Sequence, residues 1–180
     1  MTTDIKINNI EYLVDKFLPD IVRLALVYVK NMEDAEDIGQ QVFVTYLHKK
    51  PVFIDGEHAK RWLFKVAVNL AKNTMRSKKN MANFDDYANV LFTYDTDYGL
   101  DDRENEVVQA VMRLKPSYRE VVHLYYYDGY DTNEISKILL IPHATVRTRL
   151  ARARAELKKD LEGGEFCERQ LQKCDVENNG

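Results

Sequence analysis

The sequence predicts an all-α protein of two small helical domains, joined by an acidic flexible linker, with a helix-turn-helix in the C-terminal domain. Apolar residues recur at helical spacing from Asn9 to about Ser77 and again from about Asn105 to Leu161, with little of the alternation typical of strands. Acids crowd the segment from Asn83 to Glu106, where neither period is sustained. The stretch from Thr132 to Lys159 combines a short polar-capped helix, a turn and a longer helix. These three observations define the predicted architecture.

Composition and charge are those of an ordinary folded protein. Its 180 residues suffice for one domain or two small ones, and 45% of them are hydrophobic. No apolar run approaches the roughly 20 residues that cross a bilayer, and charges interrupt the N-terminus, so neither a membrane span nor a signal peptide is expected. A net charge of -3 argues against indiscriminate coating of nucleic acid, since such binding grows with the phosphates neutralised. We therefore expect a cytoplasmic protein whose local charge pattern matters more than the sum.

The first helix is expected near Ile10 to Lys30. Its core-facing side chains recur every three or four positions. They are Leu13, Phe17, Ile21 and Leu24 or Ala25.

A second helix is expected to begin between Asn31 and Asp34 and to run to about His48. Four acids near its start cap free amides and complement the positive end of the helix dipole. Gly39 inside this helix should cost about 1 kcal/mol relative to alanine; either the fold absorbs that loss, or something approaches the backbone closely there. The expected buried stripe is Ala35, Ile38, Val42 and Tyr46.

The third helix, about Glu57 to Ser77, carries an apolar stripe and a cationic row on opposite sides. A solvated basic face is one interpretation of the row. A nucleic-acid contact is the other, because Asn69 in the row suits a base edge, and Phe53 and His58 lie near lysines in the preceding loop, as suits unstacked bases. Trp62 is either a core aromatic or a residue that stacks on a base. The apolar stripe is Ala59, Leu63, Val66, Ala67 and Leu70, and the row is Arg61, Lys65, Asn69, Lys72 and Arg76.

The C-terminal helix sorts its residues by face. At about 100° per residue, Val146, Leu150, Ala153 and Leu157 form an inward stripe, and the arginines fall outside it. Small residues lie opposite the stripe, with Thr145 and Arg152 alongside to make polar contacts. A DNA major groove fits such a face. The small residues are Ala144, Thr148, Ala151 and Ala155.

The tail after Glu162 opens with Gly163-Gly164, ends polar, and is expected to fray. Its cysteines, Cys167 and Cys174, have no histidine near them, so they supply at most two of the four ligands of a zinc site. Free reduced thiols are the favoured interpretation. We expect no metal and no cofactor.

Three ordered motifs resemble one family, the extracytoplasmic-function (ECF, group IV) sigma factors of bacterial RNA polymerase. Asp34 to Phe43, DAEDIGQQVF, resembles the helix that binds the polymerase. Trp62 to Arg76, WLFKVAVNLAKNTMR, resembles the helix for the -10 promoter element. The stretch from Leu114 to Arg154 resembles the reader of the -35 element. A helix-turn-helix alone is weakly specific, but the three motifs in this order and spacing are highly specific.

The resemblance implies which residues contact polymerase and the -10 element. The loop from about Lys49 to His58 would hold a base flipped from the non-template strand, at a cost of a few kcal/mol, and the cationic row would hold the adjoining strand. A simple capped surface helix remains the alternative for the docking helix. The implied polymerase-binding residues are Asp34, Glu36, Asp37, Gln40 and Phe43. The implied -10 residues are Phe53, Arg61, Trp62, Lys65, Asn69, Lys72 and Arg76.

The resemblance also implies a -35 surface on the last helix. Arg147 lies nearer the flank and suits a phosphate, whereas His143 at the helix start is either a contact or an ordinary surface residue. Leu140 stands in the turn where many relatives have glycine, so the turn is either shaped differently or follows a longer first helix. Asn73 replaces an acid common in the -10 helix. The implied -35 residues are His143, Ala144, Thr145, Arg147, Thr148, Arg149 and Arg152.

By this resemblance, residues 1–82 form sigma region 2, 83–105 the acidic linker, 106–162 sigma region 4, and 163–180 the polar tail. The linker would pass through the polymerase cleft toward the RNA exit path, or serve only as a self-repelling spacer. The implied function is promoter-specific initiation with core RNA polymerase in the bacterial cytoplasm, without catalytic activity and under the control of an anti-sigma factor. The alternatives are an autonomous helix-turn-helix regulator and, from a third class, a nucleic-acid hydrolase, whose metal ligands the scattered histidines do not supply.

Overall fold

The computed structural model describes residues 7–81 and 102–161, and every regular element in them is helical. The N-terminal helices are α2 (Ile10–Val29), α3 (Met32–Lys49) and α4 (Gly56–Met81). The C-terminal helices are α5 (Asp102–Arg113), α6 (Pro116–Val122), the π-helical turn η3 (His123–Tyr127), α7 (Thr132–Leu139) and α8 (His143–Asp160). The predicted all-α architecture is confirmed. Helix α5 begins inside the segment predicted as linker (83–105). Residues 82–101 and 162–180, which include most of that linker and the whole predicted tail (163–180), lie outside the described part.

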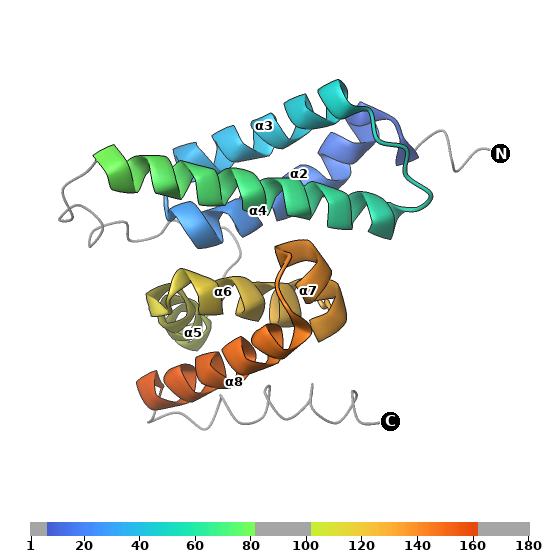
Figure 1. Ribbon diagram of the computed structural model, residues 1–180. Helices are drawn as coiled ribbons and strands as arrows, with labels where there is room; N and C mark the ends of the chain where they lie inside the picture. The colour runs from blue at the N-terminus through green and yellow to red at the C-terminus, as the bar shows by residue number, and fades with distance from the viewer. Residues whose placement is uncertain (1–6, 82–101, 162–180) are drawn as a thin grey trace.

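Helices α2, α3 and α4 lie side by side and close the N-terminal core between them (Figure 1). Asn9 and Asn31 cap α2 and α3, each through a side-chain oxygen that accepts from a backbone amide of the first turn. The stripes predicted for α2 and α3 are buried throughout. In α4 the predicted stripe is buried at Ala59, Leu63 and Ala67, and half-buried at Val66 and Leu70.

The close approach expected at Gly39 comes from α2. A β-carbon at this position would lie 2.9 Å from Leu18 Cδ1 and 3.0 Å from Val22 Cγ2. Glycine therefore lets α2 and α3 pack closely, and this packing offsets its weak helix propensity.

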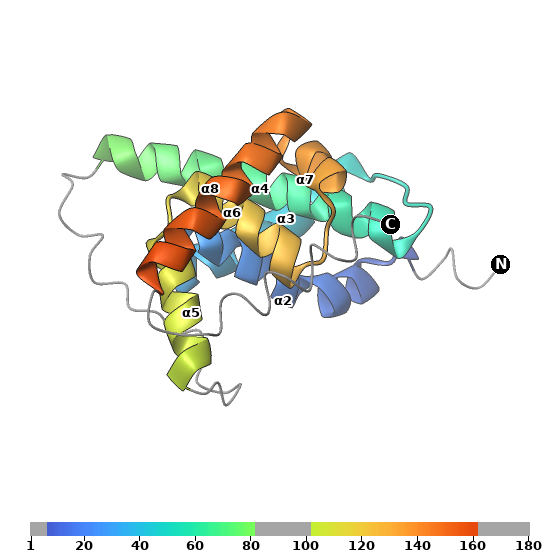
Figure 2. The same cartoon turned by 90° about the horizontal axis from the view of Figure 1, so that it is seen from below.

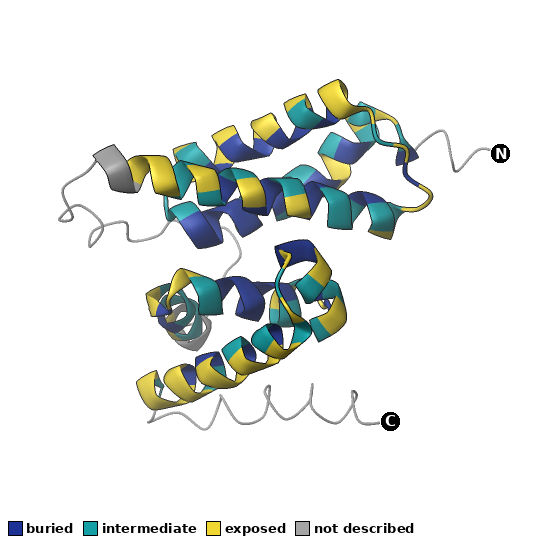
Figure 3. Cartoon of the chain, viewed as in Figure 1, coloured by how far each residue is buried: buried dark blue, intermediate teal, exposed yellow. Residues whose placement is uncertain are grey.

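In the C-terminal domain, α8 lies across α6 and α7 (Figure 2). A capping box opens α7, because Asp131 accepts from the amides of Asn133 and Glu134 while the Glu134 carboxylate accepts from the Asp131 amide. The inward stripe of α8 is buried at all four predicted positions, Val146, Leu150, Ala153 and Leu157. Its outer face is mostly exposed (Figure 3).

The turn between α7 and α8 resolves the question raised by Leu140. Helix α7 ends at Leu139, and Leu140 adopts the left-handed conformation with φ 56° and ψ 44°. The helix is therefore not extended, and the turn takes the form that glycine favours. For an L-residue with a β-carbon this conformation costs about 1–2 kcal/mol.

Replacing Leu140 by glycine is therefore expected to raise the free energy of unfolding by about 1 kcal/mol. The side chain is 61% exposed, so little burial is lost. Urea denaturation monitored by circular dichroism measures the effect. Leu140→Ala is the matched control, because alanine removes the side chain but keeps the backbone cost. A Leu140→Gly protein no more stable than Leu140→Ala would contradict the explanation.

The two domains pack against each other, with α2 and α4 facing α6 and α7 (Figures 1 and 2). Phe64 of α4 meets Tyr130 edge to face, with ring centroids 6.0 Å apart. Both side chains are buried. No helix within the described ranges is long and apolar enough to cross a membrane.

Candidate DNA- and polymerase-binding surfaces

The predicted -35 residues line the outer face of α8 and its start. Ala144, Arg147, Thr148 and Arg152 are exposed, whereas His143 and Thr145 are half-buried. The Thr148 hydroxyl donates to the Ala144 carbonyl at 2.9 Å. One ring nitrogen of His143 lies 2.6 Å from the Thr132 hydroxyl, so this side chain ties the start of α8 to α7.

Arg149 is placed differently from the other predicted -35 residues. Its Nη1 donates to Glu120 Oε1 at 2.6 Å, and the guanidinium is half-buried. In this arrangement Arg149 is engaged within the protein.

The row of polar side chains on α4 divides into exposed members and members that pair with the C-terminal domain. Lys65, Asn69 and Arg76 are exposed. Arg61 and Lys72 are half-buried, and each pairs with a carboxylate of the C-terminal domain: Arg61 Nη1 lies 3.1 Å from Glu134 Oε1, and Lys72 Nζ lies 3.2 Å from Glu120 Oε2.

Phe53 is not available to contact DNA, contrary to the expectation for this residue. Its side chain is 3% exposed and packs among Tyr46, Trp62 and His58, with ring centroids 5.5–5.9 Å away. The backbone there is held by Asn8, whose Oδ1 accepts from the Phe53 amide at 2.8 Å. Trp62 is half-buried in the same cluster.

The loop presents the neighbours of Phe53 instead. Val52 and Ile54 are 79% and 75% exposed. Sequence reasoning missed them, since aliphatic residues in a loop carry no stacking signal. Because all three residues from Val52 to Ile54 are apolar, nothing in their sequence indicates which one turns inward.

The predicted polymerase face of α3 is largely open to solvent. Glu36, Asp37 and Gln40 are exposed, and Asp34 is half-buried and paired with Lys78. Phe43 is 6% exposed and packs in the core, contrary to the expectation that it contacts polymerase. Sequence reasoning missed the exposed Val44 and Leu47, which follow Gln40 at helical spacing and add apolar surface to the face. The exposed residues of this surface are together called the acidic-apolar face of α3, which consists of Glu36, Asp37, Gln40, Val44 and Leu47.

A buried charged cluster lies where the domains meet. His123 Nε2 lies 3.4 Å from Asp128 Oδ2, and Lys60 Nζ of α4 lies 3.4 Å from Asp128 Oδ1. Burial lowers the pKa of His123 to about 3, helped by the nearby Arg23 guanidinium and opposed by Asp20. Burial raises the pKa of Asp128 to about 6, against the pull of Lys60.

These two shifts have opposite consequences for stability below pH 6. Between pH 6.5 and 3 His123 is protonated in the unfolded chain but not in the folded one, and this difference favours unfolding. The free energy of unfolding therefore falls as pH falls through this range, by up to about 1.4 kcal/mol per pH unit. As pH falls, Asp128 is protonated in the folded chain before it is in the unfolded one, and this difference favours folding. Its contribution to the free energy of unfolding is therefore fully present below pH 3.8 and is lost as pH rises through 6. Between pH 6 and 4 the effects of His123 and Asp128 on the pH dependence of stability should cancel.

We therefore expect substitutions at the pair to change the pH dependence in opposite directions. Relative to the parent, stability of Asp128→Asn should fall by up to about 1.4 kcal/mol for each pH unit between 6 and 4, and stability of His123→Gln should rise by a similar amount. Urea denaturation in a pH series measures both slopes. Parallel curves for the two variants would exclude this account.

Within residues 7–81 and 102–161, no three His, Cys, Asp or Glu side chains are grouped so as to hold a metal ion.

The two packed helical domains, the second a helix-turn-helix with an exposed cationic face, have the features of a DNA-binding protein. Residues 13–81 match the family model for Sigma-70 region 2, and residues 104–157 match the model for Sigma-70, region 4. The ECF RNA polymerase sigma factor SigM of Bacillus subtilis (strain 168) is 32% identical over 154 residues, which cover 83% of this chain and 93% of SigM. SigW of the same organism is 29% identical over 163 residues, covering 83% and 87%. The chain belongs to the ECF sigma factors of RNA polymerase, and it acts in promoter recognition at transcription initiation.

Two solved structures share the fold. The sigma factor RpoE, in complex with the anti-sigma factor NepR from Bartonella quintana, superposes with a TM-score of 0.67 at 22% identity, covering 86% of this chain and 98% of that one. CnrH, in complex with the cytosolic domain of CnrY, gives 0.59 at 21% identity, covering 87% and 89%.

Proposed function

We propose that three surfaces of this sigma factor divide the work of initiation. Helix α8 reads the -35 element, α4 and the loop before it hold the opened -10 element, and the acidic-apolar face of α3 docks on core RNA polymerase. These surfaces fall in region 2 (about 1–82) and region 4 (about 106–162), separated by the acidic linker. The observation that carries the proposal is that two exposed cationic helix faces belong to two different domains of one chain.

Helix α8 has the surface that a major groove requires. Ala144 and Ala151 let the backbone approach, and exposed Arg147 and Arg152 flank them. Arg147 suits a phosphate, and Arg152 and Thr145 suit base edges. The full -35 set is His143, Ala144, Thr145, Arg147, Thr148, Arg149 and Arg152.

For the -10 element, Lys65 and Arg76 supply charge to the strand and Asn69 a donor and acceptor for a base edge. Val52 and Ile54 replace Phe53 as the apolar surface beside the flipped base, and Phe53 with Trp62 supports the loop from inside. Arg61 and Lys72 join this surface once their carboxylate partners withdraw.

The remaining parts of the proposal concern partners. The acids of α3 complement a basic polymerase surface, and exposed Val44 and Leu47 add apolar area. An anti-sigma factor is the proposed inhibitor, in line with the complexes in which the RpoE and CnrH structures were solved. The chain has no catalytic activity of its own and works in the bacterial cytoplasm, where RNA polymerase acts.

Footprinting with and without core enzyme tests this proposal against the autonomous regulator. The holoenzyme should protect both elements, whereas an operator-binding regulator protects duplex DNA without polymerase.

Lys65→Ala should weaken holoenzyme binding on all promoters alike. It should also reduce the slope of log affinity against log salt concentration by about 1. Altered base preference with an unchanged salt slope would contradict the role given to Lys65.

A further inference from the structure

One carboxylate joins the two DNA-facing helices. Glu120 of α6 is 2% exposed. Burial this complete is unusual for a charged side chain. Its Oε1 accepts from Arg149 of α8 at 2.6 Å. Its Oε2 accepts from the Tyr28 hydroxyl of α2 and lies 3.2 Å from Lys72 Nζ of α4. Lys72 also lies over the Tyr28 ring, 5.8 Å from its centroid.

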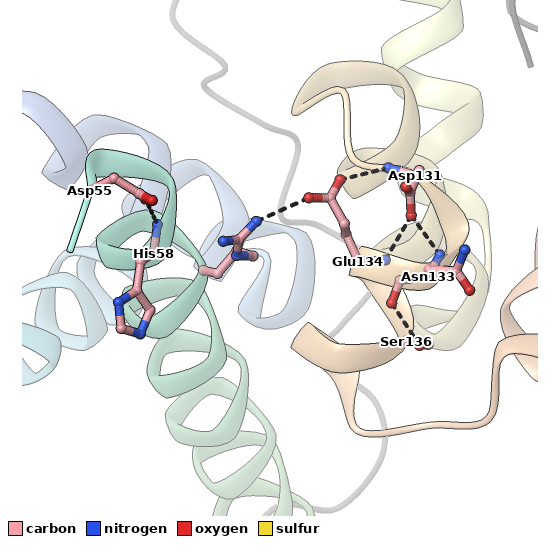
Figure 4. A network of polar contacts seen from close by, with 7 residues as sticks. Asp55, His58, Asp131, Asn133, Glu134 and Ser136 are labelled. Atoms are coloured by element: carbon pink, nitrogen blue, oxygen red, sulfur yellow. Dashed lines mark hydrogen bonds and ion pairs between the residues drawn. The ribbon is translucent and has the colours of Figure 1, made fainter. Parts of the chain in front are cut away.

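Other acids of the C-terminal domain hold α4 in the same way. Glu134 is fixed by its capping box with Asp131 (Figure 4). Its carboxylate pairs with Arg61. Asp128 pairs with Lys60, which also lies 3.6 Å from Asp20. Cations of α4 that face the C-terminal domain therefore meet carboxylates where promoter DNA would present phosphates.

In the structure the two domains pack against each other, and we call this arrangement closed. The closed arrangement cannot engage both promoter elements. The -35 and -10 elements are, by their numbering, about 25 base pairs apart, which is about 85 Å at 3.4 Å per base pair. Helix α8, with 18 residues, is only about 27 Å long, and in the closed state its domain lies against α4. The domains must separate before both elements are bound, and separation breaks the Lys72–Glu120 and Arg61–Glu134 pairs that cross between them.

We propose that Glu120 is the latch of an autoinhibited state, in which carboxylates of the C-terminal domain occupy Lys72 and Arg61, the DNA-binding cations of α4. The inference rests on the DNA-binding roles proposed above. Removing one member of a buried ion pair leaves the others desolvated and unpaired, so losing the Glu120 charge favours the open state. Apparent affinity for DNA falls with the fraction of molecules that are open, so the closed state keeps the free chain off promoters.

Glu120→Gln in the full chain tests the latch, because glutamine keeps the shape and removes the charge. Asp160→Asn is the matched control: it removes one negative charge from the same domain, and Asp160 pairs with Arg113 inside that domain. Tyr28→Phe is a second test that keeps the ring and removes only the hydrogen bond to Glu120. Small-angle scattering measures the radius of gyration, and fluorescence anisotropy measures binding to a labelled promoter duplex without core enzyme.

Glu120→Gln should enlarge the radius of gyration and raise affinity for the duplex by about tenfold, Tyr28→Phe should act in the same direction more weakly, and Asp160→Asn should match the parent. A Glu120→Gln chain as compact as the parent, or an equal gain of affinity in Asp160→Asn, would overturn the latch. Failure of the proposed function is distinguishable: a parent chain that gives no promoter-specific transcript with core enzyme refutes that function whatever the scattering shows.

Discussion

A chain with both Arg147 and Arg152 replaced by alanine is expected to lose promoter-directed transcription by a factor of about 30 or more. Both side chains are exposed on the outer face of α8. Within the described residues, neither makes an ion pair. Each lost contact to a base or phosphate costs about 1–3 kcal/mol, and the two together about 2–6 kcal/mol. Run-off transcription from a promoter with a -35 element measures the loss.

The matched control is the double variant Lys115→Ala and Lys159→Ala, which removes the same charge from the same domain. Both lysines are exposed and lie outside the proposed -35 set. Lys159 is seven residues beyond Arg152 on α8, about 10 Å further along its axis. An equal loss in this control would show that the net charge of the domain, and not the position of Arg147 and Arg152 in the first half of α8, drives binding.

Truncation of Phe64 is expected to have the largest effect on stability. The side chain is fully buried, packs edge to face on Tyr130 across the domain boundary and lies under Lys60. Phe64→Ala should lower the free energy of unfolding by about 3–5 kcal/mol, because it removes apolar burial and leaves a cavity. Urea denaturation measures the change.

The neighbouring residue supplies the control for Phe64. Lys65 is exposed on the same helix, so Lys65→Ala should change stability by no more than about 0.5 kcal/mol. A loss below about 1 kcal/mol for Phe64→Ala would mean that the packing between α4 and Tyr130 contributes little.

Local patterns in the sequence predicted the helices well, because each helix buries one face at a period of 3.6 residues. The stripe from Val146 to Leu157 is a signal contained within a single element, and it was found where expected. The second helix begins where expected, but its cap is Asn31 and not one of the acids to which the capping was assigned. The exposed acids of α3 and the exposed Lys65 and Asn69 follow from the same periodicity, since they lie off the apolar stripe.

What the sequence did not predict depends on contacts between distant elements. Periodicity shows which face is apolar, but it does not show that α4 is covered by a second domain, so Arg61 and Lys72 were expected to be as free as Lys65. Glu120 carries no local sign of its burial, because its three partners lie on α2, α4 and α8. Phe53 was expected to face DNA because composition alone does not tell which of three successive loop residues turns inward.

Transcription with purified core RNA polymerase tests the central claim most directly. The chain plus core enzyme, on a genome-wide pool of templates, is expected to give run-off transcripts from a subset of promoters at which core enzyme alone is silent. Those promoters should share a -35 and a -10 element. The absence of any chain-dependent transcript across the pool would contradict the account.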